Sequence, residues 1–303
     1  PWQLEGVIRT MLQDGYAPGR IYACHNRTVV VSAKKGEINN KHKPVVEKYG
    51  LENIHLYEDQ EWIRYEPRGK FLVLDKIFPK GIKIPKRFIG DNILHLPTMK
   101  THVFTNMTGV MKNAFGGLLN EKRHWTHSVI DETLVDLLMI QKEIHSGMFA
   151  VMDGTIAGDG PGPRCMVPVE KNYMLAGADP VAIDAIAAKM MGFDPLSLKF
   201  IRLAHERDLG VGDPAEIDVV GEDITDVNFG FQTGQSTFAS RGQHMLYHGR
   251  LKMLEKHLLQ TFLVPWSYVA SRLYHDVYWY PFIGKKRVKM MKDTDWGRLF
   301  ETY

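Results

Sequence analysis

The sequence predicts an α/β protein with a mixed or mostly parallel sheet flanked by helices, followed by a helical, aromatic C-terminal extension. Short apolar runs of strand character alternate with amphipathic helical segments over residues 1–229, a pattern typical of sheets covered by helices. From about residue 230 the composition changes, first to Gly, Ser, Thr and Gln and then to aromatic residues. We therefore expect a core over 1–229, with its motifs over 90–195, and a linker and extension over 230–303.

The composition narrows the class of protein. An apolar content of 44% and a charged content of 24% are those of a soluble globular chain, and no apolar run reaches the ~18 residues of a membrane-spanning helix. The net charge of +3 is too small to predict a nucleic-acid partner. Only Cys24 and Cys165 are present, so an intrinsic iron–sulfur cluster is not expected, and a reducing, cytoplasmic setting is.

Five elements are expected before residue 90. They are a helix over 2–15, a strand over 27–33, a helix near 42–49, a strand near 53–57 and a strand over 70–74. Apolar residues recur at helical spacing in the first helix, and the segment over 27–33 is rich in β-branched residues. Lys34-Lys35-Gly36 would form a solvated turn or an anion-contacting loop, and residues 75–89 a surface excursion.

The middle of the chain predicts a strand, a turn and a helix in close succession. Ile93 to Leu96 has strand character and Pro97 stops it. A polar turn is expected at 98–102 and a helix at 105–115, closed by Gly116-Gly117.

This stretch carries the candidate active site. In α/β sheets the loop after a strand's carboxyl end usually holds the ligand, and that loop here contains Lys100, Thr101 and His102. Thr108 and Lys112 are four apart and share one helix face. Lys100, His102 and Lys112 are therefore the first catalytic candidates, with Thr101 and Thr108 as binding residues.

The second half of the chain predicts six further elements. They are a helix over 131–144, a strand over 148–152, a strand over 173–178, a helix from Asp179-Pro180 to Gly192, a helix near 195–206 and a strand over 216–220. Asp179 has the chemistry of an N-cap, with Pro180 as the first helical residue. Asp184 lies in an otherwise apolar run, so its carboxylate either faces the surface or needs a buried partner. We expect it to be buried and paired.

A glycine-rich segment follows the expected strand over 148–152. Asp153 stands at the strand's end, and Gly158, Gly160 and Gly162 lead to Arg164. Glycines allow backbone N–H groups to approach a ligand closely, although the spacing is not that of a nucleotide phosphate loop. We expect Asp153 to be catalytic and the glycines and Arg164 to bind substrate or cofactor. The alternative is a wide turn that Asp153 caps.

His124 and His127 are three residues apart. On a helix both imidazoles would lie on one face and could bind the same divalent transition metal. Two other roles stay open for the pair, a structural one and a contact between one imidazole and an anionic substrate.

The C-terminal extension combines aromatic and basic residues. Residues 244–283 have a helical, aromatic-rich pattern, and Lys285, Lys286, Arg287, Lys289 and Lys292 follow directly. Such a segment fits peripheral contact with an anionic membrane or with a protein through 262–292. The alternative is a helix that packs over the core with a solvated basic tail. Assembly of the chain into a homo-oligomer stays open.

Four motifs together carry a resemblance to a family. LPTMKTHVFTNMTGVMKNAFGG, HWTH, VMDGTIAGDGPGPR and GADPVAIDAIAAKMMG occur in this order over about 90–195. The chain resembles in this region the uncharacterised family called domain of unknown function 362. The resemblance implies that Asn113, next to Lys112, and Asp184 belong to the binding set. Many members of the family carry ferredoxin-like cysteine clusters, which this chain lacks.

A second, weaker resemblance is to the nickel-pincer lactate racemases. In that family a histidine acts as acid or base, a lysine on a following helix anchors the cofactor, and a later histidine ligates nickel. His102, Lys112 and either His124 or His127 stand in that order here. However, the glycine pair that precedes the lysine in the racemases follows it in this chain. The resemblance implies a histidine–lysine–histidine site.

Three hypotheses for function follow. The first is a small-molecule enzyme that uses the Lys/His/Asp site for acid–base or metal-assisted chemistry, like a racemase, an isomerase or a redox enzyme, on an anionic substrate. The second is a non-catalytic module that binds an anion, a metal or a cofactor. The third is an accessory protein that docks through its C-terminal aromatic and basic segment.

Overall fold

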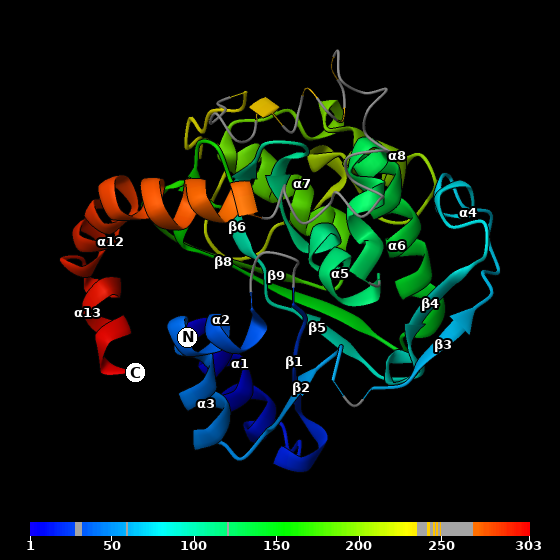
Figure 1. Cartoon of the computed structure of the whole chain (residues 1–303), viewed down its shortest axis with the longest axis horizontal. Coiled ribbons are helices and arrows are strands. Elements are labelled where there is room, and N and C mark those ends of the chain that lie inside the picture. The colour runs from blue at the N-terminus through cyan, green and yellow to red at the C-terminus, as the bar shows by residue number, and fades with distance from the viewer. Residues whose placement is uncertain are drawn as a thin grey trace.

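A computed structural model describes residues 1–27, 32–58, 60–119, 121–234, 241, 242, 245, 247, 249 and 269–303 (Figure 1). The α-helices are α1 (Trp2–Gln13), α2 (Ala33–Asn39), α3 (His42–Lys48), α4 (Leu74–Ile77), α5 (Val110–Leu118), α6 (Ile130–Ile144), α7 (Pro180–Met191), α8 (Lys199–His205), α12 (Lys285–Lys292) and α13 (Asp295–Thr302). The strands are β1 (Tyr22–His25), β2 (Glu52–His55), β3 (Trp62–Tyr65), β4 (Ile82–Pro85), β5 (Ile93–His95), β6 (Thr98–His102), β7 (Asn106–Thr108), β8 (Met148–Asp159) and β9 (Val167–Gly177). Short 3₁₀ helices are η1 (Pro18–Arg20), η2 (Lys86–Phe88), η3 (Glu121–Val129), η4 (Pro195–Ser197) and η5 (Pro214–Glu216), and η7 (Leu273–Gly284) is a π-helix.

The central sheet is built around the long strand β8. β9 pairs with β8 in antiparallel fashion along most of its length. On the other edge β8 pairs first with β5 and then with β6, both parallel to it, and β7 continues antiparallel from β6. The predicted α/β architecture with a mixed sheet is therefore confirmed.

The main core lies between this sheet and the helices α5 to α8, which cover one side of β8 and β9 (Figure 1). Met99 and Met152 from the sheet and Leu134, Leu138 and Phe200 from the helices are fully buried there. The helical periodicity of α6 and α7 predicted this layer, because an apolar stripe that faces a sheet must be covered. The cap at the start of α7 is confirmed, since Asp179 Oδ1 accepts hydrogen bonds from Val181 and Ala182 N–H.

The N-terminal part of the chain forms a smaller layer on the other side of the long strands (Figure 1). β1 and β2 form a two-stranded parallel sheet whose core is shared with α1 and α3. The prediction of a helix at 2–15, a helix at 42–49 and a strand near 53–57 is confirmed within a few residues. Residues 28–31 of the expected strand over 27–33 lie outside the described residues, and Ala33 begins α2, so Lys34-Lys35-Gly36 is helical and not a loop.

The expected strand over 70–74 is wrong, and a buried carboxylate explains why. Asp136 of α6 is 1% exposed and accepts hydrogen bonds from the backbone N–H groups of Leu72, Val73 and Leu74. These donors point to the carboxylate and are not available to a neighbouring strand. Burial raises the pKa of Asp136, and the three N–H groups oppose that rise. The surface excursion expected over 75–89 instead contains α4 and the buried strand β4, which pairs with β3.

The middle of the chain differs from its prediction in two elements. Residues 98–102 form the strand β6 and not a turn, because Met99 and Thr101 alternate into the interior while the backbone pairs with β7 and β8. The helix begins at Val110 and not at residue 105, since Asn106–Thr108 forms β7. Gly116 and Gly117 lie inside α5 and do not end it.

β8 continues seven residues beyond the predicted end of its strand. Asp153, Gly154 and Gly158 are strand residues that pair with β9, so the glycine-rich loop begins only near Gly160. The predicted strand over 216–220 is absent from the described residues, where 214–216 form η5 and Val220 is 97% exposed.

The described end of the chain forms a helical edge of the molecule. η7, α12 and α13 follow one another along this edge, and the C-terminus returns to the neighbourhood of α1 (Figure 1). Trp296 of α13 lies 5.0 Å from Trp2, ring centre to ring centre, and donates a hydrogen bond to Asn172 of β9. Within the described ranges no helix is long and apolar enough to cross a membrane.

Candidate active site

β6 positions the first group of candidate residues. Lys100 lies opposite Thr108 of β7 and opposite Gly158 of β8, so the side chains of Lys100 and Thr108 lie on one face of the sheet. Thr101 Oγ1 lies between the carbonyl oxygens of Gly158 (3.2 Å) and Gly160 (2.7 Å), which ties the glycine-rich segment to β6. His102 Nδ1 accepts the N–H of Phe104 at 3.1 Å, so the imidazole is neutral and its proton is on Nε2.

The N-terminus of α5 is held by Asp184. This carboxylate is fully buried and accepts hydrogen bonds from Val110 N–H (2.6 Å) and Met111 N–H (3.0 Å). The expectation that Asp184 is buried and paired is confirmed. A Cβ at Gly109 would lie 2.0 Å from Asp184 Oδ1, so glycine is required there for the approach. Burial raises the pKa of Asp184 to about 7, while the two N–H groups oppose the rise.

Lys112 is placed by this anchored helix. The side chain is half-buried, and its Nζ lies 5.2 Å from the ring centre of Phe115. Burial lowers the pKa of Lys112 to about 7, the charge of Lys100 lowers it further, and the carboxylate of Asp131 opposes both. Burial also lowers the pKa of Lys100. Lys112 therefore lies within electrostatic reach of Lys100, from another element, and of the carboxylate of Asp131.

Aromatic rings contact both Lys112 and the histidines His102 and His127. His127 stacks on Tyr247 at 5.4 Å between ring centres and meets Phe104 and Phe115 edge-on. Phe104 also lies 5.9 Å from the His102 ring. Burial and the charge of Lys112 lower the pKa of His127 to about 3, so its imidazole is neutral. We call Lys100, His102, Phe104, Lys112, Phe115, His127, Asp131 and Tyr247 the lysine cluster.

The two histidines of the predicted metal pair lie in η3 and make different contacts there. His127 Nδ1 bonds the carbonyl oxygen of His124 at 2.9 Å, and the His124 ring lies edge-on to Trp125. Among the residues that the structure describes, no three of His, Cys, Asp or Glu are arranged to hold a metal. His127 belongs to the lysine cluster through its ring contacts with Phe104, Phe115 and Tyr247, and metal ligation by the pair stays a prediction.

The glycine-rich segment lies against β6, with Gly158 directly opposite Lys100. Val103 N–H donates to Gly162 O at 3.2 Å, and a Cβ at Gly162 would lie 2.1 Å from Thr101 O. Gly158 is enclosed by Met166 and Lys100 in the same way. Arg164 points away from the cluster and pairs with Asp276 of η7 at 3.1 Å.

Asp153 and Asn113 make their contacts elsewhere. Asp153 Oδ1 accepts hydrogen bonds from the N–H (2.8 Å) and the Oγ1 (2.6 Å) of Thr155, which in turn accepts from Trp2 of α1. Asn113 donates to His95 Nδ1 at 3.2 Å, and His95 Nε2 donates to Gln141 at 2.6 Å. Both residues therefore serve networks that connect elements of the fold.

The hydroxyl of Thr108 is unsatisfied. Its Oγ1 is buried and has no hydrogen-bond partner among the described residues. A buried hydroxyl without a partner costs about 1–3 kcal/mol. Because Thr108 lies opposite Lys100, a ligand held by the lysine could satisfy it.

Sequence reasoning missed four members of the lysine cluster. The motifs do not single out Phe104, Phe115 or Tyr247, and they place Asp131 only at the start of the helix expected over 131–144. Spacing could have pointed to two of them, because Phe115 follows Lys112 by three residues and Asp131 follows His127 by four.

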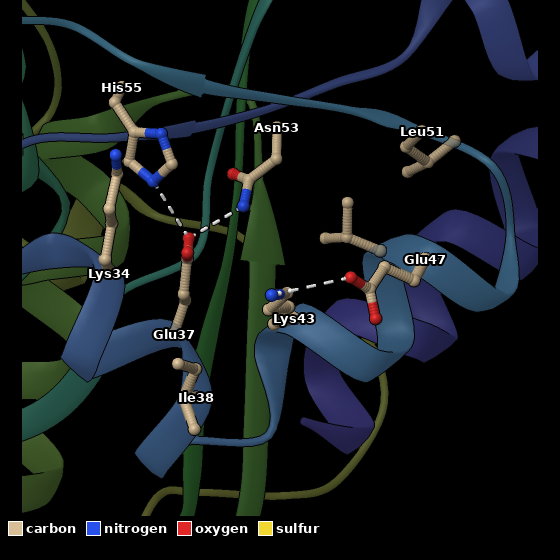
Figure 2. A pocket seen from close by; sticks show the side chains of 9 residues that line it. Lys34, Glu37, Ile38, Lys43, Glu47, Leu51, Asn53 and His55 are labelled. Carbon is tan, nitrogen blue, oxygen red and sulfur yellow. Dashed lines mark hydrogen bonds and ion pairs between the residues drawn. The ribbon is translucent and has the colours of Figure 1, made fainter. Parts of the chain in front are cut away.

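Two cavities lie apart from the lysine cluster. One, of about 430 Å³, is lined by α2, α3 and β2 (Figure 2). At its base Glu37 Oε2 accepts from Asn53 (2.7 Å) and His55 (3.1 Å), and Lys43 pairs with Glu47 at the side. The other, of about 560 Å³, lies beside Ile186 and Lys189 of α7 and the segment 214–225. Neither cavity is lined by a residue of the candidate active site, although Lys34, from the segment for which an anion-contacting loop stayed open, lines the first.

Comparisons with known proteins agree with the four motifs. A family model described as "Domain of unknown function (DUF362)" matches residues 1–189, which extends the family region to the N-terminal layer. A protein named "Thylakoid-associated protein sll1697", from Synechocystis sp., is 25% identical over 129 residues, covering 42% of this chain and 40% of that protein. The chain thus spans about two fifths of that relative's length. No solved structure matches the chain, and the lactate racemase resemblance has no counterpart among these matches.

Proposed function

The chain belongs to the family described as "Domain of unknown function (DUF362)", and because that description names no activity, we propose its function from the lysine cluster itself. We propose that the cluster binds a small anionic substrate and that Lys112 exchanges a proton with it. The observation that carries the proposal is that Lys100 and Lys112, from β6 and α5, lie close enough for the charge of one to lower the pKa of the other.

The charges of the lysine cluster favour an anion. Lys100 and Lys112 lie near each other, and Lys112 faces one carboxylate, Asp131, whose own pKa burial raises. His102 is a neutral imidazole whose Nε2 bears the proton, so it is a hydrogen-bond donor. Burial removes the two ammonium groups from the water that stabilises their charge. A bound anion would compensate this loss, and it would give Thr108 Oγ1 a hydrogen-bond partner.

Lys112 has the properties of a general acid–base group. A group exchanges protons best when its pKa lies near the working pH, and burial brings that of Lys112 to about 7. Lys100 would hold the carboxylate or phosphate of the substrate, while Lys112 takes a proton from the substrate or returns one. This chemistry is that of a racemase or isomerase acting next to an acidic group. A redox reaction has no specific support in the cluster.

The setting that we propose is a reducing, cytoplasmic one. Cys24 and Cys165 are both free thiols, Cys24 exposed and Cys165 buried, and burial raises the pKa of Cys165 to about 11, which keeps it protonated.

Proton exchange with solvent tests the proposal. A panel of small 2-hydroxy and 2-keto carboxylates is incubated with the protein in deuterium oxide, and incorporation of deuterium at carbon is followed by NMR. We expect incorporation with at least one compound, its loss in Lys112→Met, and full activity in Lys142→Met, a change at an exposed lysine of α6. Binding of these anions without any exchange would assign the cluster to a non-catalytic module. Exchange that survives Lys112→Met would remove Lys112 from the chemistry.

A further inference from the structure

The π-helix η7 exposes one apolar face. Leu273, Val277, Tyr278 and Phe282 stand at positions i, i+4, i+5 and i+9, and in a helix with i→i+5 hydrogen bonds residues at this spacing lie on one side. All four are exposed, Val277 and Phe282 to 63% and Tyr278 to 55%. The rings of Tyr274, Tyr278 and Phe282 follow one another at 5.8 and 5.9 Å. Contiguous exposed apolar side chains of this kind mark an interaction site.

The opposite side of the same segment is fixed to the core. Asp276 pairs with Arg164, and Arg287 of α12 donates to the carbonyl oxygens of Cys165 (2.8 Å) and Met166 (2.6 Å). Gly284 is buried against Trp279 and Tyr280. The outward direction of the apolar face is therefore set by specific contacts of the inner face. The alternative, in which the helix packs its apolar residues over the core, therefore does not hold for η7.

A basic face continues directly from the apolar one. Lys285, Lys286 and Lys289 of α12 are exposed and make no ion pair with any residue that the structure describes. Lys285 and Lys289 are one helical turn apart, and Arg287 points the other way, to the core. Apolar and aromatic side chains next to lysines are the composition of a helix that lies in a membrane interface.

We propose that η7 and α12 form a docking surface for an anionic lipid bilayer. Leu273, Val277, Tyr278 and Phe282 enter the interface between headgroups and acyl chains, and the three lysines contact anionic headgroups. The positive charge of the three lysines favours a bilayer over a second copy of the chain, because two copies joined through this face would bring six lysines together. The segment lies on the outer edge of the molecule, far from α4 and β4, so a planar surface can reach it (Figure 1).

Docking would also place the membrane next to the segment that supports the lysine cluster. Arg164 and Arg287 hold η7 and α12 to residues 164–166, and the neighbouring Gly158 and Gly160 are bonded to Thr101 of β6. The docking surface does not depend on the proposed proton transfer, and its test uses no substrate.

Vesicle binding by the whole chain is the test. Flotation with vesicles of phosphatidylcholine alone and of phosphatidylcholine with phosphatidylglycerol is measured at low and raised salt. We expect binding to the anionic vesicles that weakens with salt. Lys285→Gln/Lys286→Gln/Lys289→Gln should bind on the order of a hundredfold more weakly, at about fivefold per lysine. Tyr278→Ser/Phe282→Ser should bind at least tenfold more weakly, an order-of-magnitude expectation for lost apolar insertion.

The matched controls change exposed residues outside the docking surface. Lys80→Gln/Lys83→Gln removes two exposed lysines near β4, and Val220→Ser removes an exposed apolar side chain. Both should bind as the unchanged chain does, and circular dichroism verifies that all variants fold. Failure of the unchanged chain to float with anionic vesicles overturns the proposal, as does binding that both site variants retain. A dimer that Tyr278→Ser/Phe282→Ser dissociates, without vesicle binding, would assign the face to a second copy and also overturns it.

Discussion

Burial and two charged neighbours set the pKa of Lys112. Burial lowers its pKa to about 7, Lys100 pushes in the same direction, and Asp131 pushes against it. A lysine in this position is partly a free amine at neutral pH, whereas an ordinary lysine, with a pKa near 10.5, is almost wholly charged. This difference can be measured without a substrate.

The reactivity of Lys112 toward dinitrofluorobenzene should follow its unusual pKa. Because only the neutral amine reacts, labelling of Lys112 should rise through pH 7 and level off well before that of the exposed Lys142. Asp131→Asn removes the carboxylate that raises the pKa, so the profile should move to lower pH. Lys100→Met removes a repelling charge, so the profile should move to higher pH. Peptide mapping by mass spectrometry gives the profiles, and one that matches that of Lys142 would contradict the assigned environment.

At the scale of residues, the sequence predicts best those side chains whose partners are local. Asp179 could be predicted as a cap, because the residues it caps follow it directly. The need of Asp184 for a buried partner could also be predicted, but not the identity of that partner, since Val110 and Met111 lie more than 70 residues away. Asp131 and Asp136 could not be predicted as buried or half-buried charges, because a helical pattern does not show which polar residue another segment will cover.

At the scale of elements, α5 depends on the contact between Gly109 and Asp184. The carboxylate supplies the acceptors that the first N–H groups of a helix need, and it can approach only where no Cβ stands. The start of α5 is therefore fixed by α7, and with it the position of Lys112.

Gly109→Ala should destabilise the protein by about 2–4 kcal/mol, from overpacking and a disturbed buried carboxylate. Gly116→Ala is the matched control inside the same helix. A Cβ there meets nothing within 4 Å, so alanine should stabilise by about 0.5–1 kcal/mol through helix propensity. Urea unfolding measures both, and equal effects of the two changes would refute the role of the close approach.

The elements themselves were predictable where one periodicity dominates. α1, α6 and α7 have clear helical patterns and were found within a few residues. β6 was not, because its polar residues Thr98, Lys100 and His102 resemble a turn while only Met99 and Thr101 are directed inward. The far half of β8 was not, because pairing with β9 extends through Gly154 and Gly158, which local sequence assigns to a loop.

At the scale of the whole molecule, buried neutral histidines make stability depend on pH. Burial lowers the pKa of His42 and His95 to about 4 and that of His127 to about 3, from an ordinary 6.5. Below pH 6.5 the unfolded chain takes up protons that the folded chain does not, so stability falls as the pH falls. Asp184 acts in the opposite sense, because its raised pKa of about 7 lets the folded state keep a proton between pH 7 and about 4. Burial raises the pKa of Asp131 and Asp136 too, but it also lowers the pKa of His25, His145 and His275, so six lowered histidines stand against three raised carboxyls.

We therefore expect the free energy of unfolding to decrease from pH 6.5 to pH 4.5. Each unmatched proton contributes a slope of about 1.4 kcal/mol per pH unit. His127→Phe should reduce the slope by up to that amount, whatever its effect on stability at pH 7. Urea unfolding at several pH values tests this, and an unchanged slope in the variant would show that His127 is protonated in the folded protein.

The architecture as a whole was predictable because it rests on the alternation of strand and helix patterns, which survives errors in single elements. The lysine cluster was predictable only in part. Lys100, His102 and Lys112 stand close in sequence, whereas their environment is made by Asp131, His127 and Tyr247, which reach it through the fold.

Calorimetric titration with oxalate, a small dianion that does not ionise near pH 7, tests the central claim most directly. If an anion binds between Lys100 and Lys112, it should raise the pKa of Lys112 above its starting value of about 7. Binding at pH 7 should then take up about half a proton, measured as a dependence of the binding enthalpy on the ionisation enthalpy of the buffer. Lys112→Met should abolish the uptake, and Lys142→Met should preserve it. Oxalate binding without proton uptake, uptake that persists in Lys112→Met, or no binding at all would contradict the account.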